Sequence, residues 1–375
     1  MEFVMEKYIG LMSGTSMDGV DAVLVEMNDH NIKLLGNHDY PMPSDLKQAL
    51  MDVCIGQSTN LQQIGELDHR LGQLFADAVN ALLQKTQTPA SAIKAVASHG
   101  QTVFHAPDSL YPFTMQLGDA NIIAAKTGIT TVADFRRKDM AFGGQGAPLV
   151  PAFHQQLFSD KKINRVILNI GGISNITVLT PNKPVIGFDT GVGNMLMDAW
   201  INLHLQQSYD KNAQWALSGT VNVELLANLF SEPYLSLSAP KSTGRELFNL
   251  PWLEQHLSGL TIKPEDVQAT LAEYTAVTIA NDVRQTAQDT PDNMPNELLV
   301  CGGGAHNPLI MHRLTQLLTD WTVTTTNERG VDSDNMEAMA FAWLGYRTLH
   351  GLSGNLPEVT GASRLTTLGA IYPTQ

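Results

Sequence analysis

Three glycine-rich turns are the first feature of the sequence that could do chemistry. They span residues 13–19, 171–175 and 302–306, and each follows a short apolar run that predicts a strand. Small residues let the backbone approach an anion, and consecutive N–H groups in such a turn bind phosphate. A single turn of this kind is better explained as an ordinary connection. Three of them, each at the carboxyl end of a strand, favour a nucleotide-binding cleft.

Asp189 is the leading candidate for a general base. It follows the apolar run 186–188 and stands just before a helix that the sequence predicts from residue 192. Burial and neighbouring groups tune the pKa of a carboxyl at such a place, so that it can accept a proton from a substrate. The same position suits a side chain that caps the helix. The spacing alone leaves both roles open.

Familiar nucleotide and hydrolase motifs are missing. Residues 14–19 have the glycine spacing of a Walker A loop, but Val20 and Asp21 follow where lysine and a hydroxyl residue are required. Neither Gly-x-Ser-x-Gly nor His-Glu-x-x-His occurs in the sequence. The sequence therefore predicts neither a serine-hydrolase elbow nor a dedicated metal site.

The elements that must position these residues recur in the two halves of the chain. Segment 8–27 reads as strand, turn and strand, and segment 165–179 repeats this layout about 155 residues later. Strands then alternate with helices, which predicts α/β layers, and the hairpins make the sheets mixed. Further strands are predicted at 32–40, 92–97, 185–188 and 297–300, and long helices at 61–85, 192–205, 264–289 and 335–350.

Length and composition limit the classes of function. The chain has 375 residues, which is enough to form two hydrophobic cores. Charged residues make up 16% of the sequence, and the formal net charge is −14. Such acidity disfavours binding to nucleic acid or to an anionic membrane. No apolar run approaches the about 18 residues of a membrane span, no secretory leader is visible, and two cysteines suit a reducing compartment. We expect a soluble, cytoplasmic protein.

Two domains are expected from the length and from the repeat. The Gly/Pro-rich stretch 142–151 indicates the boundary, which we place at its start or slightly earlier. The predicted domains are residues 1–134 and 135–350, with a tail at 351–375 that returns to the first domain.

Several segments resemble the anhydro-N-acetylmuramic acid kinase family, in the family's order and from about residue 8 to about residue 370. The combination is specific, although no single segment is. The segments are MSGTSMDGVDAVLVE (12–26), SHGQT (98–102), ADFRRKDMAFGGQGAPLVP (133–151), NIGGISN (169–175), GFDTGVGN (187–194), CGGGAHNP (301–308) and VTGA (359–362).

The resemblance implies a fold and a reaction. The family belongs to the superfamily of actin, sugar kinases and heat-shock chaperones. This membership implies two duplicated, ribonuclease-H-like α/β domains, with mixed sheets flanked by helices and ATP in the cleft between them. The implied reaction uses water, activated by Asp189, to open 1,6-anhydro-N-acetylmuramic acid. The released O6 then attacks the γ-phosphate of ATP and gives N-acetylmuramic acid 6-phosphate and ADP.

The same resemblance assigns the three turns. The first two would hold phosphates, and the third would border the adenosine. The nucleotide-binding residues implied in this way are Gly14, Thr15, Ser16, Met17, Asp18, Gly19, Val20, Asp21, Gly171, Gly172, Ser174, Gly302, Gly303 and Gly304.

The first turn departs from the wider superfamily in one respect. Met12 stands where an aspartate that helps to hold the metal is usual. Either Asp18 or Asp21 compensates, or the phosphates and water hold the Mg²⁺ ion. The metal ligands are therefore not assigned.

Candidate sugar-binding residues each have a plainer alternative. Arg136 suits a bidentate clamp on the lactyl carboxylate of the sugar, or a salt bridge. Glu337 matches a family position near the sugar, but it follows Asp334 at the spacing of a helix capping box. His99 is either a sugar contact or a structural histidine.

Asp119 and Asn175 complete the sugar-binding candidates. Asp119 precedes a predicted helix, and it either bonds sugar hydroxyls or caps that helix. Asn175 closes the second turn. A homodimer would also be in keeping with the family, although no interface can be read from the sequence.

Two other classes of function compete with the kinase. One is a non-catalytic ATP-binding switch of the same fold. The other is a glycosidase with Asp189 and Glu337 as its two carboxylates, which would need no ATP and would leave the three turns unexplained.

Overall fold

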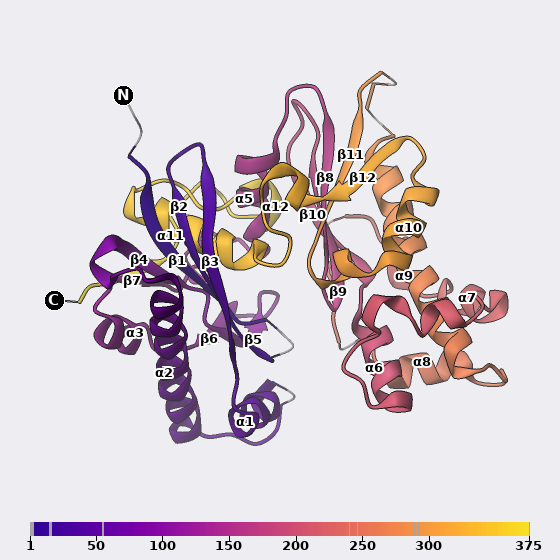
Figure 1. Cartoon of the computed structure of the whole chain (residues 1–375), viewed down its shortest axis with the longest axis horizontal. Helices are drawn as coiled ribbons and strands as arrows, with labels where there is room; N and C mark the ends of the chain where they lie inside the picture. The colour runs from indigo at the N-terminus through magenta and orange to yellow at the C-terminus, as the bar shows by residue number, and fades with distance from the viewer. Residues whose placement is uncertain are drawn as a thin grey trace. The chain divides into compact units, whose positions relative to one another are not determined.

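The structure is a computed structural model of the chain that describes residues 4–14, 17–54, 56–239, 241–245, 247–288, 290–291 and 293–374 (Figure 1). The chain divides into two compact units. Unit 1 consists of Met1–Leu157 and Asn335–Gln375, and unit 2 consists of Phe158–Asp334.

Unit 1 is built on a mixed sheet with the strand order β13-β7-β4-β1-β2-β3. The first three strands form an antiparallel meander, and β4 and β7 extend the sheet parallel to β1. A separate hairpin, β5–β6, follows β4. The strands are β1 (Glu6–Met12), β2 (Gly19–Met27), β3 (Ile32–Pro41), β4 (Ile93–Ser98), β5 (Gln101–Ala106), β6 (Phe113–Leu117), β7 (Thr131–Ala133) and β13 (Ala370–Tyr372).

The longest helix of unit 1 shows how local signals set an element. The Asn60 side chain caps its first turn by accepting from Gln63 N, and Gln87 ends it in the left-handed conformation. Its apolar stripe packs against β2 and β3. The helices of unit 1 are α1 (Ser44–Cys54), α2 (Leu61–Thr86), α3 (Ala120–Thr127), α4 (Arg137–Ala141), α5 (Val150–Phe158, whose last residue counts to unit 2), α11 (Met336–Leu349) and α12 (Pro357–Thr360).

Helix α11 comes from the C-terminal part of the chain but lies against the first strands of unit 1 (Figure 1). Two glycines allow this close approach. A Cβ at Gly10 would lie 1.9 Å from Ala338 O, and a Cβ at Gly345 would lie 2.7 Å from the Ala97 side chain. Since the helix is buried on nearly all sides, it forms part of the core of unit 1.

Unit 2 is built on a mixed sheet with the order β10-β9-β8-β11-β12. The first three of its strands in the chain are again an antiparallel meander, and the last two run parallel to the first. The strands are β8 (Asn164–Ile170), β9 (Ile173–Leu179), β10 (Ile186–Val192), β11 (Asn296–Cys301) and β12 (Trp321–Thr325), and the helices are α6 (Met195–Leu205), α7 (Val223–Leu229), α8 (Leu250–Leu257), α9 (Pro264–Thr286) and α10 (Pro308–Leu317).

The two sheets therefore repeat one topology. Strands β1, β2, β3, β4 and β7 of unit 1 correspond in order and direction to β8, β9, β10, β11 and β12 of unit 2. The third strand is followed by α1 and α2 in unit 1 and by α6, α7, α8 and α9 in unit 2. The predicted fold class, a duplicated α/β domain with mixed sheets flanked by helices, is confirmed.

The limits of the two units differ from the predicted domains. Residues 135–157 and 335–350 were placed in the second domain, but they lie in unit 1. The reason for the second segment is tertiary, because α11 packs on β1 and β4. The tail contributes β13, which pairs with β7 of the same unit. Among the described residues, no helix has both the length and the apolarity to span a membrane.

Candidate active site

Asp189 lies inside a strand and not at the start of a helix. Strand β10 continues to Val192, and α6 begins at Met195 with Asn194 in the N-cap position. The Asp189 oxygen Oδ2 accepts hydrogen bonds from Ser242 Oγ and Thr243 N, each at 3.0 Å. The alternative role as a cap of α6 is therefore ruled out, because the carboxylate is bonded elsewhere.

A row of polar residues crosses three strands at this point. Asn169 of β8 pairs with Asn175 of β9, and Asn175 pairs with Asp189 of β10. Residues directly opposite each other in a sheet direct their side chains to the same face. Asn175 is therefore the neighbour of the acid. The sequence analysis missed Asn169, although its place at the end of an apolar strand and before two glycines was a usable signal.

The turn between β8 and β9 is bonded to the residues that follow β10. Gly171 O accepts from Asn194 N at 2.8 Å, and Gly172 O accepts from Gly193 N at 2.9 Å. Ser174 is fully buried and its Oγ lies 3.4 Å from Val192 O, so in this structure the hydroxyl supports the turn. By contrast, a Cβ at Gly172 would have its nearest neighbour at 3.6 Å. Packing does not require a glycine there, which leaves room for a ligand to approach.

The third turn contains glycines of two kinds. A Cβ at Gly302 would lie 2.3 Å from Asn169 Oδ1, and a Cβ at Gly304 would lie 2.2 Å from the Ile170 side chain. These two glycines are required so that the turn can pack on β8. A Cβ at Gly303 would meet nothing closer than 3.9 Å. Gly303 is therefore the glycine of this turn whose space is open to a ligand.

The first turn lies in unit 1 and is only partly described, since Thr15 and Ser16 are outside the described residues. Met17 and Val20 are buried in the core, so their side chains are structural. Gly14 has open space around it, and Gly19 approaches Tyr40 O so closely that a Cβ would lie 2.5 Å away. Of the described residues of this turn, Gly14 is therefore the glycine with open space beside its backbone.

Acidic side chains gather beside the first turn. Asp21 is exposed, yet desolvation by its surroundings, then the charges of Asp39, Glu337 and Asp18, raises its pKa to about 6. Asp18 forms an ion pair with Lys47 at 2.5 Å. The described residues contain no group of three or more His, Cys, Asp or Glu side chains that could hold a metal ion. We therefore assign no metal ligand.

Arg136 and His99 form a pair in unit 1, in which His99 is buried and Arg136 is partly buried. The Arg136 guanidinium donates to His99 Nε2 from Nε at 3.0 Å and from Nη2 at 2.9 Å, and to Gly146 O from Nη1 at 3.1 Å. Burial, followed by the charge of Arg136, holds the pKa of His99 well below its usual value. Burial likewise lowers the pKa of Arg136 to about 10, although Glu337 opposes this. His99 is therefore neutral and accepts at Nε2.

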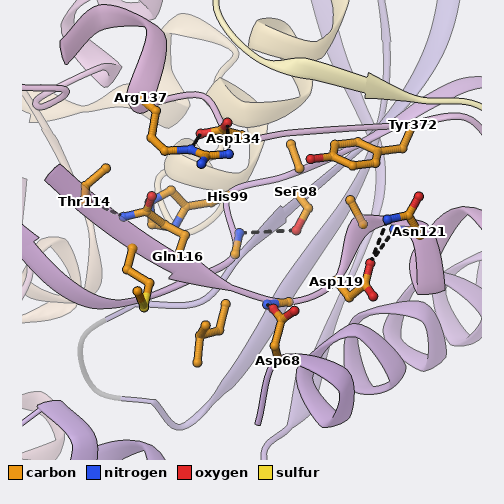
Figure 2. A pocket seen from close by; sticks show the side chains of 16 residues that line it. Asp68, Ser98, His99, Thr114, Gln116, Asp119, Asn121, Asp134, Arg137 and Tyr372 are labelled. Carbon is orange, nitrogen blue, oxygen red and sulfur yellow. Dashed lines mark hydrogen bonds and ion pairs between the residues drawn. The ribbon is translucent and has the colours of Figure 1, made fainter. Parts of the chain in front are cut away.

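A polar pocket of about 430 Å³ lies in unit 1, at the carboxyl ends of β4 and β7 (Figure 2). It contains His99 and Asp119, two of the predicted sugar-binding residues. Figure 2 shows Arg137 beside Asp134 and Asp119 beside Asn121 at its wall. The lining residues are Asp68, Ser98, His99, Gly100, Thr114, Met115, Gln116, Leu117, Gly118, Asp119, Ala120, Asn121, Ala133, Asp134, Arg137 and Tyr372.

The carboxylates of the pocket are held by local bonds. Asp119 Oδ1 accepts from Asn121 N at 2.8 Å, which caps α3, so the cap role of Asp119 is confirmed alongside its place in the pocket. Asp68 Oδ1 accepts from Gly118 N at 2.7 Å, and burial raises the pKa of this carboxyl. Arg137 pairs with Asp134 at 2.5 Å. Such a wall offers acceptors and one cation to a polar ligand.

Glu337 does not complete the predicted capping box. The N-cap of α11 is Asn335, one residue later than the box requires, and Asp334 pairs instead with His306 at 2.6 Å. Glu337 lies close enough to Asp21 and Arg136 for its charge to raise the pKa of both. The structure therefore brings Glu337 together with Asp21, Arg136 and, through Arg136, His99.

The polar pocket also contains residues that the sequence analysis missed. Arg137 was within reach, because it lies in a segment that carries the resemblance, and Gln116 lies three residues before the candidate Asp119. Asp68 gave no local signal, since it is one more polar residue within the long helix α2. Tyr372 reaches the pocket only because β13 pairs with β7.

The comparisons with known proteins agree with each other. A family model described as anhydro-N-acetylmuramic acid kinase matches residues 6–374. The chain is 70% identical, over 98% of its length and 99% of the relative's, to an anhydro-N-acetylmuramic acid kinase of Photobacterium profundum. Proteins of the same name from Vibrio vulnificus (strain YJ016) and Pasteurella multocida are 62% and 57% identical, with 98% of this chain and 98% and 96% of theirs covered.

Proposed function

The chain belongs to the anhydro-N-acetylmuramic acid kinase family and is therefore a phosphotransferase with an alcohol group as acceptor, and we propose that it both hydrolyses and phosphorylates its sugar. The substrate would be 1,6-anhydro-N-acetylmuramic acid, with ATP as the phosphoryl donor. The observation that carries this proposal is the Asp189 carboxylate. It is fixed in orientation by Ser242 and Thr243, in the same unit as two glycine turns.

The proposed reaction balances around Asp189. The carboxylate takes a proton from water while the water oxygen bonds to C1 of the sugar. The C1–O6 bond breaks, and its electron pair stays on O6, which bonds to the γ-phosphorus of ATP while ADP leaves. The products are N-acetylmuramic acid 6-phosphate and ADP, and the proton passes from Asp189 to solvent.

Positioning is the main demand that phosphoryl transfer makes on a protein. We propose that Gly14, Gly171, Gly172 and Gly303, which have room beside their backbone, approach the nucleotide. Gly302 and Gly304 are explained by their packing on β8. Because the described residues offer no metal cluster, a Mg²⁺ ion would enter with ATP and be bound mainly by phosphates and water.

The polar pocket of unit 1 is the proposed sugar site. Asp119, Asp68 and Gln116 can accept from or donate to hydroxyl and amide groups, and Arg137 supplies a cation. The Arg136 guanidinium is already bonded to His99 and Gly146, so we propose that it orients His99 and does not clamp the lactyl carboxylate. Glu337, whose charge acts on Arg136, would contribute to the sugar site of unit 1, and Asn175 would lie beside Asp189 in unit 2.

The substrate defines the setting of the reaction. An anhydro-muramic sugar derives from peptidoglycan, so the enzyme would serve cell-wall recycling and amino-sugar catabolism. Its need for ATP favours the cytoplasm. A homodimer stays a prediction that follows from the family.

ADP release tests the proposal. The protein should release ADP when 1,6-anhydro-N-acetylmuramic acid is present, and the sugar product should gain one phosphate. N-acetylglucosamine and glucose, which have no anhydro bridge, serve as controls and should give little ADP. Sugar opening without ATP would contradict the proposal and favour a glycosidase, and ADP release that ignores the sugar would favour a switch.

A further inference from the structure

The main-chain groups of Asp189 are bonded by residues from outside the sheet. Strand β10 is the edge strand of the unit 2 sheet, where one side of a strand lacks a partner strand. Asp189 N donates to Lys241 O at 3.1 Å, and Asp189 O accepts from Tyr234 OH at 2.7 Å. The backbone of the proposed base is therefore fixed from this side, and strand β9 pairs with β10 on the other side.

The next two residues of the same segment bond the carboxylate. Ser242 Oγ and Thr243 N both donate to Asp189 Oδ2 at 3.0 Å. Hydrogen bonds to a carboxylate favour its ionised form, which lowers the pKa of the group. Because both bonds fall on one oxygen, they also fix the carboxylate plane.

Lys241 anchors this segment to the core of unit 2. Its side chain is only 3% exposed, and its Nζ lies 3.2 Å from Asp282 Oδ2 on helix α9. The same Nζ lies 5.3 Å from the ring centroid of Tyr234 and 5.6 Å from that of Phe188. A buried ion pair is costly to break from one side, so Lys241 is held firmly. Through it, the neighbouring Ser242 and Thr243 are held as well.

We propose that residues 241–243 are a positioning segment for Asp189. Ser242 and Thr243 orient the carboxylate through Oδ2 and keep it ionised, and the ion pair of Lys241 with Asp282 holds the segment in place. The inference rests on the proposed role of Asp189 as the general base.

The pH dependence of kcat/KM for the sugar tests Ser242. In Ser242→Ala the Asp189 carboxylate loses one of its hydrogen-bond donors, so its pKa rises. The acidic limb of the profile of kcat/KM against pH should then move to higher pH by about 0.5–1 unit. We expect kcat to fall about tenfold, with the KM for ATP changed less than about twofold. Ser242→Thr keeps a hydroxyl and should restore the limb.

A matched serine controls for the loss of a hydroxyl. Ser231 lies in the same unit and bonds a backbone carbonyl, Asn228 O, at 2.6 Å. Ser231→Ala should leave the limb where it is. The proposal is overturned if Ser242→Ala leaves the limb in place, or if Ser242→Thr behaves like Ser242→Ala. A different result would contradict the proposed function itself, namely an Asp189→Asn enzyme that remains active.

Lys241 needs a pair of variants, because Lys241→Met leaves Asp282 buried without its partner. The single variant should lower the thermal midpoint and shift the acidic limb upward. In Lys241→Met/Asp282→Asn the unpaired charge is gone, so the midpoint should recover while the limb stays shifted. Recovery of both would show that Lys241 acts through stability alone and would contradict its part in positioning.

Discussion

The two units share one topology but carry their insertions at different places. In unit 1 the connection from α1 to α2 is short, from Cys54 to Leu61, whereas in unit 2 the chain between α6 and α9 runs from Leu205 to Pro264. That long connection contains α7, α8, Tyr234 and the 241–243 segment. Unit 1 instead inserts the β5–β6 hairpin after β4, which supplies Thr114, Gln116 and Leu117 to the polar pocket.

Each insertion thus builds one half of the proposed chemistry on the same scaffold. The hairpin of unit 1 lines the pocket that we propose for the sugar, and the long connection of unit 2 bonds the proposed base. A duplicated domain supplies equivalent strands, and the residues added between its elements make the copies different.

The two meanders also differ in the polar residues that pair between their second and third strands. In unit 1, Asp21 of β2 pairs with Asp39 of β3, and the like charges contribute to the raised pKa of Asp21. In unit 2, Asn175 of β9 pairs with Asp189 of β10. An amide beside the acid brings no like charge, so this pair lacks the repulsion that acts between Asp21 and Asp39.

Removing the proposed base should give the largest effect, and the change lies in unit 2 alone. In Asp189→Asn the side chain keeps its shape but cannot accept the proton, so kcat should fall at least about 1,000-fold. ATP affinity, measured by calorimetry, should change less than about twofold. A matching loss of ATP affinity would mean that Asp189 maintains the fold.

Two glycines of the third turn separate a packing role from a ligand role. Gly304→Ala places a methyl group against Ile170, so the free energy of unfolding should fall by about 1–3 kcal/mol. Gly303→Ala should change it by less than about 0.5 kcal/mol, since its space is open. Denaturant titration measures both, and the ATP affinity of Gly303→Ala should fall. Equal destabilisation of the two variants would contradict the distinction.

The pocket of unit 1 is tested by a change that keeps the helix cap. Asparagine caps a helix about as well as aspartate, so Asp119→Asn should leave the thermal midpoint nearly unchanged. The lost charge weakens hydrogen bonds to the sugar, and the sugar KM should rise about tenfold. The KM for ATP is the control and should stay within about twofold. A variant with unchanged sugar KM would place the sugar elsewhere.

Substitution of Asp21, which pairs with Asp39 in unit 1, should give the smallest effect, and this effect should appear in the stability of the protein. The pKa of Asp21 is about 6 in the folded protein and about 3.9 in the unfolded chain, so the folded state gains protons between these values. The loss of stability caused by the ionised Asp21 is therefore complete above about pH 6 and absent below about pH 4. Because the side chain is exposed, Asp21→Asn should stabilise the protein at pH 7.5 by only about 1 kcal/mol. An equal gain at pH 4 would contradict this cause.

The repeated meander and its turns could be predicted because their signals are local. Alternating apolar residues and glycines mark each hairpin, and the end of the run 186–188 marked Asp189. The cap role could be excluded only from the structure, since the sequence does not show that β10 continues to Val192.

What the sequence could not show depends on tertiary contacts. Ser242 is more than fifty residues from Asp189, and only the path of the long connection brings them together. The apolar pattern at 335–350 predicted the helix that the structure shows as α11. It could not show which sheet this helix packs on. Arg136 was singled out as a candidate, but its bonds to His99 depend on tertiary packing that the sequence does not show.

Isotope labelling in H₂¹⁸O tests the central claim most directly, that Asp189 primes a water molecule for attack on the sugar. Mass spectrometry of the product, taken before the anomeric oxygen exchanges with solvent, should show one ¹⁸O atom at C1 and none in the transferred phosphate. Unlabelled product, or label in the phosphate, would contradict the account.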